Sequence, residues 1–172
     1  MNNKETRIKL ILLGDSGVGK TAIIQRYHED KFNPSLNSTT GANFLAKELI
    51  INDQKIILEL WDTAGQEEYR SLTKVFIKNT KIIILVYDVT SLGSFNSLNF
   101  WYDFIKKEIG TEIVLGLAGN KTDLIFENDF DEEISPEKGK EFAQKIGSSF
   151  VLISAKESSN EIKELFNELL MK

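Results

Sequence analysis

Two kinds of hydrophobic pattern alternate along the chain. Short segments are apolar at nearly every position, which is typical of strands buried on both faces of a parallel sheet. Longer segments carry apolar residues every three or four positions, which is typical of helices that pack one face on such a sheet. We expect strands at 8–13, 82–87, 113–118 and 150–153, and helices at 20–27, 69–79, 94–109, 136–146 and 160–171.

Two further apolar segments, 44–51 and 55–61, flank the polar turn 52–54 (Asn-Asp-Gln), which predicts a β-hairpin. The whole pattern predicts an α/β fold of three layers, with a six-stranded, mostly parallel sheet, one antiparallel strand and about five helices. Because no Gly/Ser-rich linker interrupts the pattern, we expect residues 1–172 to form a single domain. Ligands bind such sheets at the carboxyl ends of the strands, so functional motifs should follow the apolar segments.

Composition excludes several classes of protein. Lys and Arg number 21 against 26 Asp and Glu, a net charge of −5, which argues against a nucleic-acid partner. The absence of cysteine excludes a disulfide framework, a thiolate zinc site and a cysteine nucleophile. The polar start of the chain lacks a signal-peptide core, and the apolar segments are too short to span a bilayer. We therefore expect an intracellular protein.

A phosphate-binding motif follows the first expected strand. Residues 14–21 read Gly-Asp-Ser-Gly-Val-Gly-Lys-Thr, a full match to the P-loop pattern G-x-x-x-x-G-K-[ST]. In such a loop the backbone N–H groups point at phosphates, Lys20 supplies a positive charge and Thr21 offers a hydroxyl to Mg²⁺. We therefore predict that a nucleotide is bound by Asp15, Ser16, Gly17, Val18, Gly19, Lys20, Thr21 and Ala22.

Two later segments point to the base of that nucleotide. Residues 120–123 (Asn-Lys-Thr-Asp) follow an expected strand, and the Asp123 carboxylate would accept from N1–H and the 2-amino group of guanine. Adenine lacks that pair of donors, so a buried carboxylate would reject it. A backbone N–H of residues 154–156 would meet guanine O6. The predicted base-binding residues are Asn120, Lys121, Asp123, Ser154, Ala155 and Lys156.

A fourth segment, 61–67 (Trp-Asp-Thr-Ala-Gly-Gln-Glu), closes the second hairpin strand. Here Asp62 would hold Mg²⁺ through water, and the backbone at Gly65 would approach the γ-phosphate. Gln66 would orient an attacking water, so Gln66 and Lys20 are the predicted catalytic residues.

These four segments occur in the order found in the Ras superfamily of small GTPases, which the chain resembles over about residues 6–171. Residues 38–44, 69–72 and 85–90 most resemble the Rab family. The resemblance implies a P-loop GTPase domain that hydrolyses GTP to GDP and phosphate with Mg²⁺. It also implies that Thr39 completes the Mg²⁺ shell and that Phe32 packs against guanine.

The resemblance further implies a monomeric switch in vesicle trafficking, located in the cytosol and on the cytoplasmic face of endomembranes. Its partners would be an exchange factor, a GTPase-activating protein and effectors that contact Phe44, Trp61 and Phe76. Rab proteins end in a flexible tail with prenylated cysteines, whereas this chain stops at Lys172 without one. We therefore expect membrane association through a tail that this chain lacks.

The arginines bear on the rate of hydrolysis. They are Arg7, Arg26 and Arg70, and none lies between residues 28 and 44, where an arginine supplied in cis would sit. We therefore expect slow intrinsic hydrolysis, on the order of 10⁻⁴ to 10⁻³ s⁻¹. Three alternatives stay open: a GTP-binding scaffold with poor hydrolysis, a non-Rab switch of the same superfamily, and a small-molecule kinase on a P-loop fold.

Overall fold

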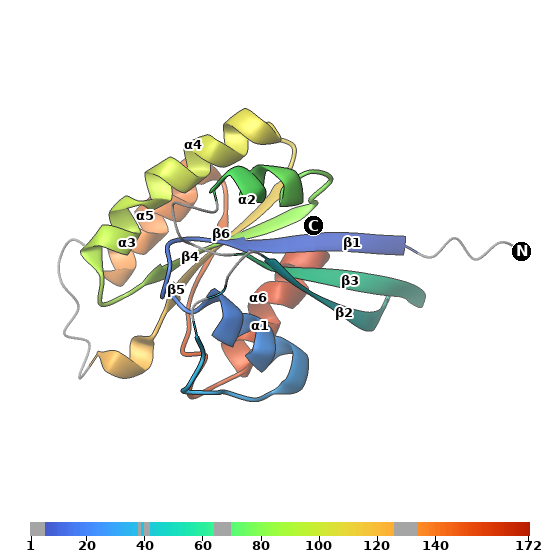
Figure 1. Cartoon of the computed structure of the whole chain (residues 1–172), viewed down its shortest axis with the longest axis horizontal. Helices are drawn as coiled ribbons and strands as arrows, with labels where there is room; N and C mark the ends of the chain where they lie inside the picture. The colour runs from blue at the N-terminus through green and yellow to red at the C-terminus, as the bar shows by residue number, and fades with distance from the viewer. Residues whose placement is uncertain (1–5, 38, 40–41, 64–69, 126–133) are drawn as a thin grey trace, which may run out of the picture.

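The computed structural model describes residues 6–37, 39, 42–63, 70–125 and 134–172, with the backbone alone at 70–72. A six-stranded sheet crosses the molecule in the order β2-β3-β1-β4-β5-β6 (Figure 1). β2 and β3 form the expected antiparallel hairpin, and every other neighbouring pair is parallel. The strands are β1 (Thr6–Leu13), β2 (Ala42–Ile51), β3 (Gln54–Thr63), β4 (Ile82–Asp88), β5 (Val114–Asn120) and β6 (Ser149–Leu152).

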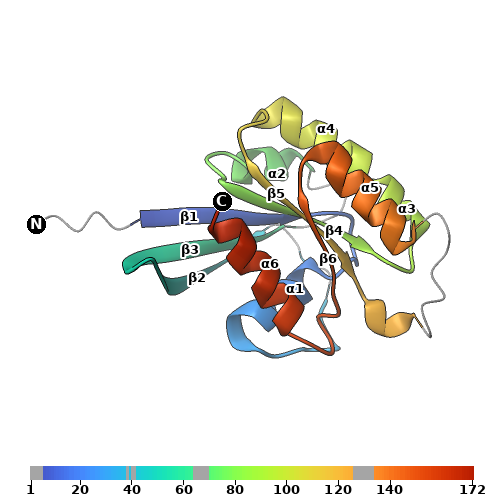
Figure 2. The ribbon, with the colours of Figure 1, turned by 180° about the vertical axis from the view of Figure 1, so that it is seen from behind.

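Helices cover both faces of this sheet, which confirms the predicted α/β fold of three layers. Helices α1 (Lys20–Glu29) and α6 (Asn160–Leu170) lie on one face (Figures 1 and 2). The other face carries α2 (Arg70–Phe76), α3 (Leu92–Asn96), α4 (Leu98–Glu108) and α5 (Pro136–Ile146). A short 3₁₀ turn, η2 (Thr122–Leu124), follows β5. Among the described helices, none has the length and apolar character needed to cross a bilayer.

Strand β4 shows why some segments are apolar at every position. All seven of its residues are buried, and alternate side chains point to opposite faces of the sheet. Ile82, Ile84 and Val86 join the hydrophobic core beneath α1 and α6. Ile83, Leu85 and Tyr87 join the second core, beneath α4 and α5. A strand whose side chains enter a hydrophobic core on each face has no polar face, so apolar and polar residues do not alternate along its sequence.

The helical segment expected at 94–109 is two helices, α3 and α4, that meet at Ser97. The Ser97 hydroxyl donates to the carbonyl oxygen of Gly93, four residues earlier, at 3.1 Å. The Ser91 side chain caps the start of α3 by accepting from the Ser94 N–H at 3.3 Å. Serine side chains that bond to nearby backbone compete with regular helical bonding, which accounts for the break.

The parallel strands place the sequence motifs at one edge of the sheet. The glycine loop 14–19 follows β1, residues 121–123 follow β5, and residues 153–156 follow β6. Asp62 lies near the carboxyl end of β3, where it pairs with Leu12 of β1. Segments up to about 140 residues apart in the chain therefore meet at the carboxyl edge, as the topology of such sheets requires.

Candidate functional site

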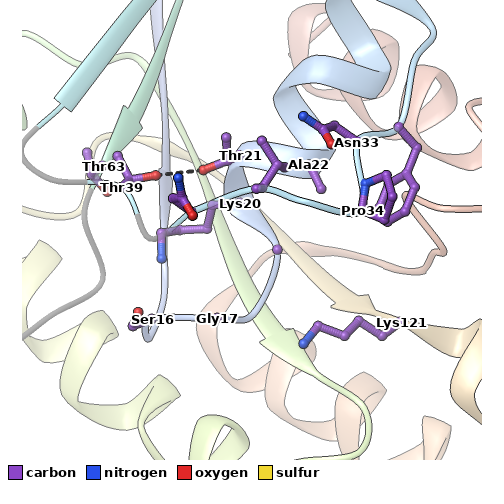
Figure 3. Close-up of a pocket in the computed structure, with 14 residues that line it drawn as sticks. Ser16, Gly17, Lys20, Thr21, Ala22, Asn33, Pro34, Thr39, Thr63 and Lys121 are labelled. Carbon is purple, nitrogen blue, oxygen red and sulfur yellow. Dashed lines mark hydrogen bonds between the residues drawn. The ribbon is translucent and has the colours of Figure 1, made fainter.

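A cavity of about 330 Å³ opens at this edge (Figure 3). Thr39 and Thr63 lie at one end of it, and Pro34 and Lys121 at the other. The predicted residues in its wall are Ser16, Gly17, Gly19, Lys20, Thr21, Ala22, Phe32, Thr39 and Lys121. The wall also contains Asn33, Pro34, Leu36, Asn37 and Thr63, which the motifs did not identify. These five residues lie close in sequence to Phe32, Thr39 or Asp62, and that nearness was the one signal by which the sequence could have predicted them.

Two glycines let the loop lie directly on the strand ends. Gly14 has φ +151°, and a Cβ at this position would overlap the carbonyl oxygen of Val86 on β4. Gly19 has φ +99°, and a Cβ there would overlap Nδ2 of Asn120 on β5. Any L side chain would be strained at either position; at Gly14 it would push the loop off β4, and at Gly19 it would displace the Asn120 amide. The motif glycines are therefore required by close approach as well as by conformation.

Lys20, at the start of α1, is buried and folds back over this loop. Its Nζ donates to the carbonyl oxygens of Gly14 and Asp15, both at 2.8 Å. Burial lowers the pKa of Lys20 to about 8, against the opposing attraction of the Asp62 and Asp15 carboxylates. The amine thus stands beside the cavity as the positive charge that a polyphosphate needs.

Three oxygen-bearing side chains converge at the Thr39 end of the cavity. Thr21 Oγ1 donates to Asp62 Oδ2 at 2.6 Å and lies 2.8 Å from Thr39 Oγ1. Thr39 Oγ1 is also 3.3 Å from Asp62 Oδ2. Burial raises the pKa of Asp62, although hydrogen bonds from Thr21 and the charge of Lys20 oppose that shift. Within the described part of the chain, Asp62 Oδ1 is buried without a hydrogen-bond partner.

This cluster has the chemistry of a Mg²⁺ site. Mg²⁺ takes oxygen ligands, often one or two protein groups supplemented by water and phosphate oxygens. Two hydroxyls and one carboxylate, whose Oδ1 is buried with spare accepting capacity, meet that requirement. The residues present therefore fit the metal that the sequence motifs predict.

Asn120 connects the glycine loop to the loop after β6. Its Nδ2 donates to the carbonyl oxygen of Val18 at 2.9 Å, and its Oδ1 accepts from the Ala155 N–H at 3.2 Å. The side chain is buried, so both bonds form away from water. Asn120, Val18 and Ala155 are thus joined in one unit, although none of the three is in the cavity wall.

Ionic and hydrogen-bond contacts hold the other predicted base-binding residues. Asp123 Oδ1 accepts from the Ser154 hydroxyl at 2.7 Å, and Asp123 Oδ2 lies 3.6 Å from Lys156 Nζ. Lys121 adopts φ +72° and pairs with Asp88 Oδ2 at 2.6 Å. The structure therefore brings all six predicted base-binding residues together. Of these six, Lys121 is the one that lines the cavity.

Trp101 of α4 is a contact that the motifs missed. Its indole Nε1 donates to Asp15 Oδ1 at 2.9 Å, and the ring is almost fully buried. Asp15 therefore turns its side chain toward α4, while its carbonyl oxygen faces Lys20. In the sequence Trp101 is one more apolar residue of a helix, and nothing in its spacing distinguishes it.

The three predicted effector residues form a continuous row of rings, here called the aromatic row. The ring centroids of Phe44 and Trp61 are 5.2 Å apart, and those of Trp61 and Phe76 are 5.4 Å apart. Phe44 is 48% exposed, which makes it one of the large apolar side chains that face solvent. Lys9 lies over the Trp61 ring, with its Nζ 4.4 Å from the centroid.

Gly65 and the predicted catalytic Gln66 lie outside the described residues, so their roles stay predictions. The rest of the predicted site lies within the described part of the chain and meets at one edge of the sheet.

The model of the Ras family matches residues 9–172, nearly the whole chain. Members of this family are small GTPases that bind guanine nucleotide with Mg²⁺ and serve as switches. Exchange factors, GTPase-activating proteins and effectors act on them. The sheet order, the glycine loop and the family match agree, and the chain belongs to the Ras family.

Proposed function

We propose that this chain is a Rab-like switch that binds GDP or GTP in the 330 Å³ cavity and hydrolyses GTP slowly. In its GTP state it recruits effectors through the aromatic row, in vesicle and membrane trafficking. It would act in the cytosol and on the cytoplasmic face of endomembranes.

The phosphate end of the cavity supports this proposal through charge and hydrogen bonding. Lys20 bonds to two loop carbonyl oxygens and lies in the cavity wall, where it would supply positive charge to the outer phosphates. The loop N–H groups and the start of α1 favour negative charge at the same place. Thr21, Thr39 and Asp62 would hold Mg²⁺, which supplies neutralisation of the charge on the phosphate oxygens when bound.

The base end supports guanine. The Asp123 side chain is 6% exposed and takes a hydrogen bond from Ser154 on one oxygen. Guanine would offer this carboxylate its paired N1–H and 2-amino donors, and adenine lacks that pair, so the site would discriminate against adenine. Phe32, in the cavity wall, offers a ring against which a purine would pack.

One observation carries the switch proposal: the middle ring of the aromatic row, Trp61, is adjacent in sequence to Asp62, which would hold Mg²⁺ with Thr21 and Thr39. Trp61 immediately precedes Asp62 on β3, and it pairs with Phe44 of β2 across the hairpin. Thr39, three residues before β2, reaches Asp62 at 3.3 Å. Loss of the γ-phosphate would release Thr39, and the hairpin that carries the aromatic row would lose one of its tethers.

Hydrolysis would depend on position and charge rather than on covalent chemistry. Lys20 would hold positive charge at the outer phosphates, and Gln66 would orient the attacking water. The expected intrinsic rate is on the order of 10⁻⁴ to 10⁻³ s⁻¹, because no arginine lies between residues 28 and 44. A single-turnover rate two decades faster without a partner would contradict this account.

The first experiment is to purify the protein, denature it and chromatograph the nucleotide that it releases. Near-stoichiometric GDP or GTP supports guanine binding, and GDP additionally supports turnover. An empty or adenine-bearing protein would overturn the proposal. Binding of candidate effectors to the GTP form should then be lost in Phe44→Ala, while an Ile50→Ala variant, also exposed and on β2, should bind normally.

A further inference from the structure

Arg26 makes contacts that no part of the proposed nucleotide chemistry uses. It lies in the last part of α1, and its guanidinium reaches across to the loop after β6. Nε donates to the carbonyl oxygen of Ala155 at 2.7 Å, and Nη2 donates to the carbonyl oxygen of Lys156 at 2.6 Å. The side chain is 14% exposed. A largely buried guanidinium thus donates hydrogen bonds to two successive peptide groups of this loop.

The same guanidinium also holds the end of α1. Nη1 donates to the carbonyl oxygen of Asp30 at 3.1 Å and lies 3.6 Å from Asp30 Oδ1. Asp30 terminates α1 in the left-handed conformation, with φ +58°, and its carboxylate accepts from Lys163 of α6 at 3.3 Å. Two residues further on is Phe32, in the cavity wall. Arg26 therefore ties the loop after β6 to the segment that leads into Phe32.

We infer that Arg26 is a positioning residue that sets how tightly the protein holds the guanine base. This inference rests on the proposed function and deepens it. Asn120 Oδ1 holds the N–H of Ala155, and Arg26 holds its carbonyl oxygen, so Ala155 is fixed from both sides. Because a peptide group is planar, fixing the Ala155 carbonyl also fixes the direction of the Lys156 N–H. The backbone donors that would meet guanine O6 are thus oriented from α1.

Arginine suits this role better than lysine does. Its planar fork presents several N–H groups at once, so one side chain can bind the carbonyl oxygens of Ala155, Lys156 and Asp30 together. A lysine ammonium is a single point of attachment on a flexible stem. A purely local role, capping α1 through Asp30, would not require the two contacts across 129 and 130 residues of sequence.

The first test compares Arg26→Met with Arg7→Met. Methionine keeps much of the apolar stem but removes the donors, and Arg7, on β1, is 55% exposed and pairs with Glu59. We expect GDP to dissociate from Arg26→Met roughly tenfold faster than from the unchanged protein, because bonds from a charged donor are lost. Arg7→Met should dissociate GDP at the unchanged rate. Single-turnover hydrolysis of bound GTP should stay within about twofold in both variants.

The second test uses a changed ligand to separate base positioning from general destabilisation. In 6-thio-GDP, sulfur replaces O6, whereas the N1–H and 2-amino donors for Asp123 are kept. The unchanged protein should prefer GDP to 6-thio-GDP, and Arg26→Met should lose most of that preference. If Arg26→Met weakens both ligands by the same factor, or leaves GDP dissociation unchanged, the inference is wrong.

Arg26→Lys keeps the charge and tests the inference even if Arg26→Met does not fold. We expect it to retain one of the two loop contacts and to dissociate GDP about threefold faster, with a smaller loss of preference against 6-thio-GDP. If Arg26→Lys keeps both the GDP dissociation rate and the preference for GDP over 6-thio-GDP of the unchanged protein, the guanidinium is not required and the inference is wrong. Failure of the unchanged protein to bind GDP at all would instead refute the proposed function, which keeps the two failures distinct.

Discussion

Replacing Trp101 with phenylalanine would remove one hydrogen bond between α4 and the glycine loop. The Trp101 Nε1–H donates to Asp15 Oδ1 at 2.9 Å, and the indole is 1% exposed. A bond to a charged group contributes about 1.5–3 kcal/mol when buried. Because Asp15 is only half-buried, we expect the lower part of that range for the bond itself. The smaller ring also leaves a cavity that costs about 1–2 kcal/mol more.

A double-mutant cycle separates these two contributions. Trp101→Phe, Asp15→Ala and the double variant would be unfolded in urea and followed by circular dichroism, with nucleotide and Mg²⁺ held constant. The cavity term is present with and without Asp15, so it cancels. We expect a coupling free energy of about 1.5–2 kcal/mol between Trp101 and Asp15.

A matched cycle of Trp61→Phe with Asp15→Ala serves as the control. Trp61 contacts Phe44, Phe76 and Lys9 in the aromatic row, so its effect should add to that of Asp15→Ala within about 0.5 kcal/mol. If the Trp101 cycle is additive to the same degree, the indole bond contributes nothing to stability. The link between α4 and the glycine loop would then be refuted.

Three further outcomes follow from the candidate site. Asp123→Asn should shift the ratio of the affinities for xanthosine diphosphate and GDP by about 100-fold toward xanthosine diphosphate, because the new amide donates to the 2-oxo group of xanthine. Competition binding that still favours GDP would contradict this. Burial lowers the pKa of Lys20 to about 8, and a bound polyphosphate favours its charged form, so GDP binding should take up a proton above about pH 8. Affinity measured by calorimetry should be level below that pH and fall by up to about tenfold per pH unit above it; a level profile to about pH 9.5 would be evidence against the role of Lys20. Thr39→Ala should raise the Mg²⁺ concentration needed to retain a GTP analogue by about tenfold, with GDP affinity little changed, and an unaltered Mg²⁺ titration would remove Thr39 from the metal site.

Local pattern was sufficient to predict the strands to within two residues and the limits of α5 and α6 to within one, whereas α1 runs two residues further than expected and α2 ends three residues earlier. The apolar segments and their spacing mark which faces are buried, and burial of a face is a property of neighbouring residues. The pattern failed to show the break at Ser97, because a serine hydroxyl that bonds to the Gly93 carbonyl leaves no mark on hydrophobic spacing. The pattern indicated that Trp101 is buried, but it did not predict the hydrogen bond from Trp101 to Asp15.

The glycine loop, the lysine and threonine that follow it, and the α/β class of the fold could all be predicted from the amino-acid sequence. These features are local, since each depends on residue types at fixed spacing along one strand and one helix. The contacts between distant groups became visible in the folded chain: Thr39 with Asp62, and Asn120 with Val18 and Ala155. So did the contacts of Arg26 with the loop after β6. Such contacts depend on strand order and register, and these arise from packing across the whole sheet rather than from any one segment.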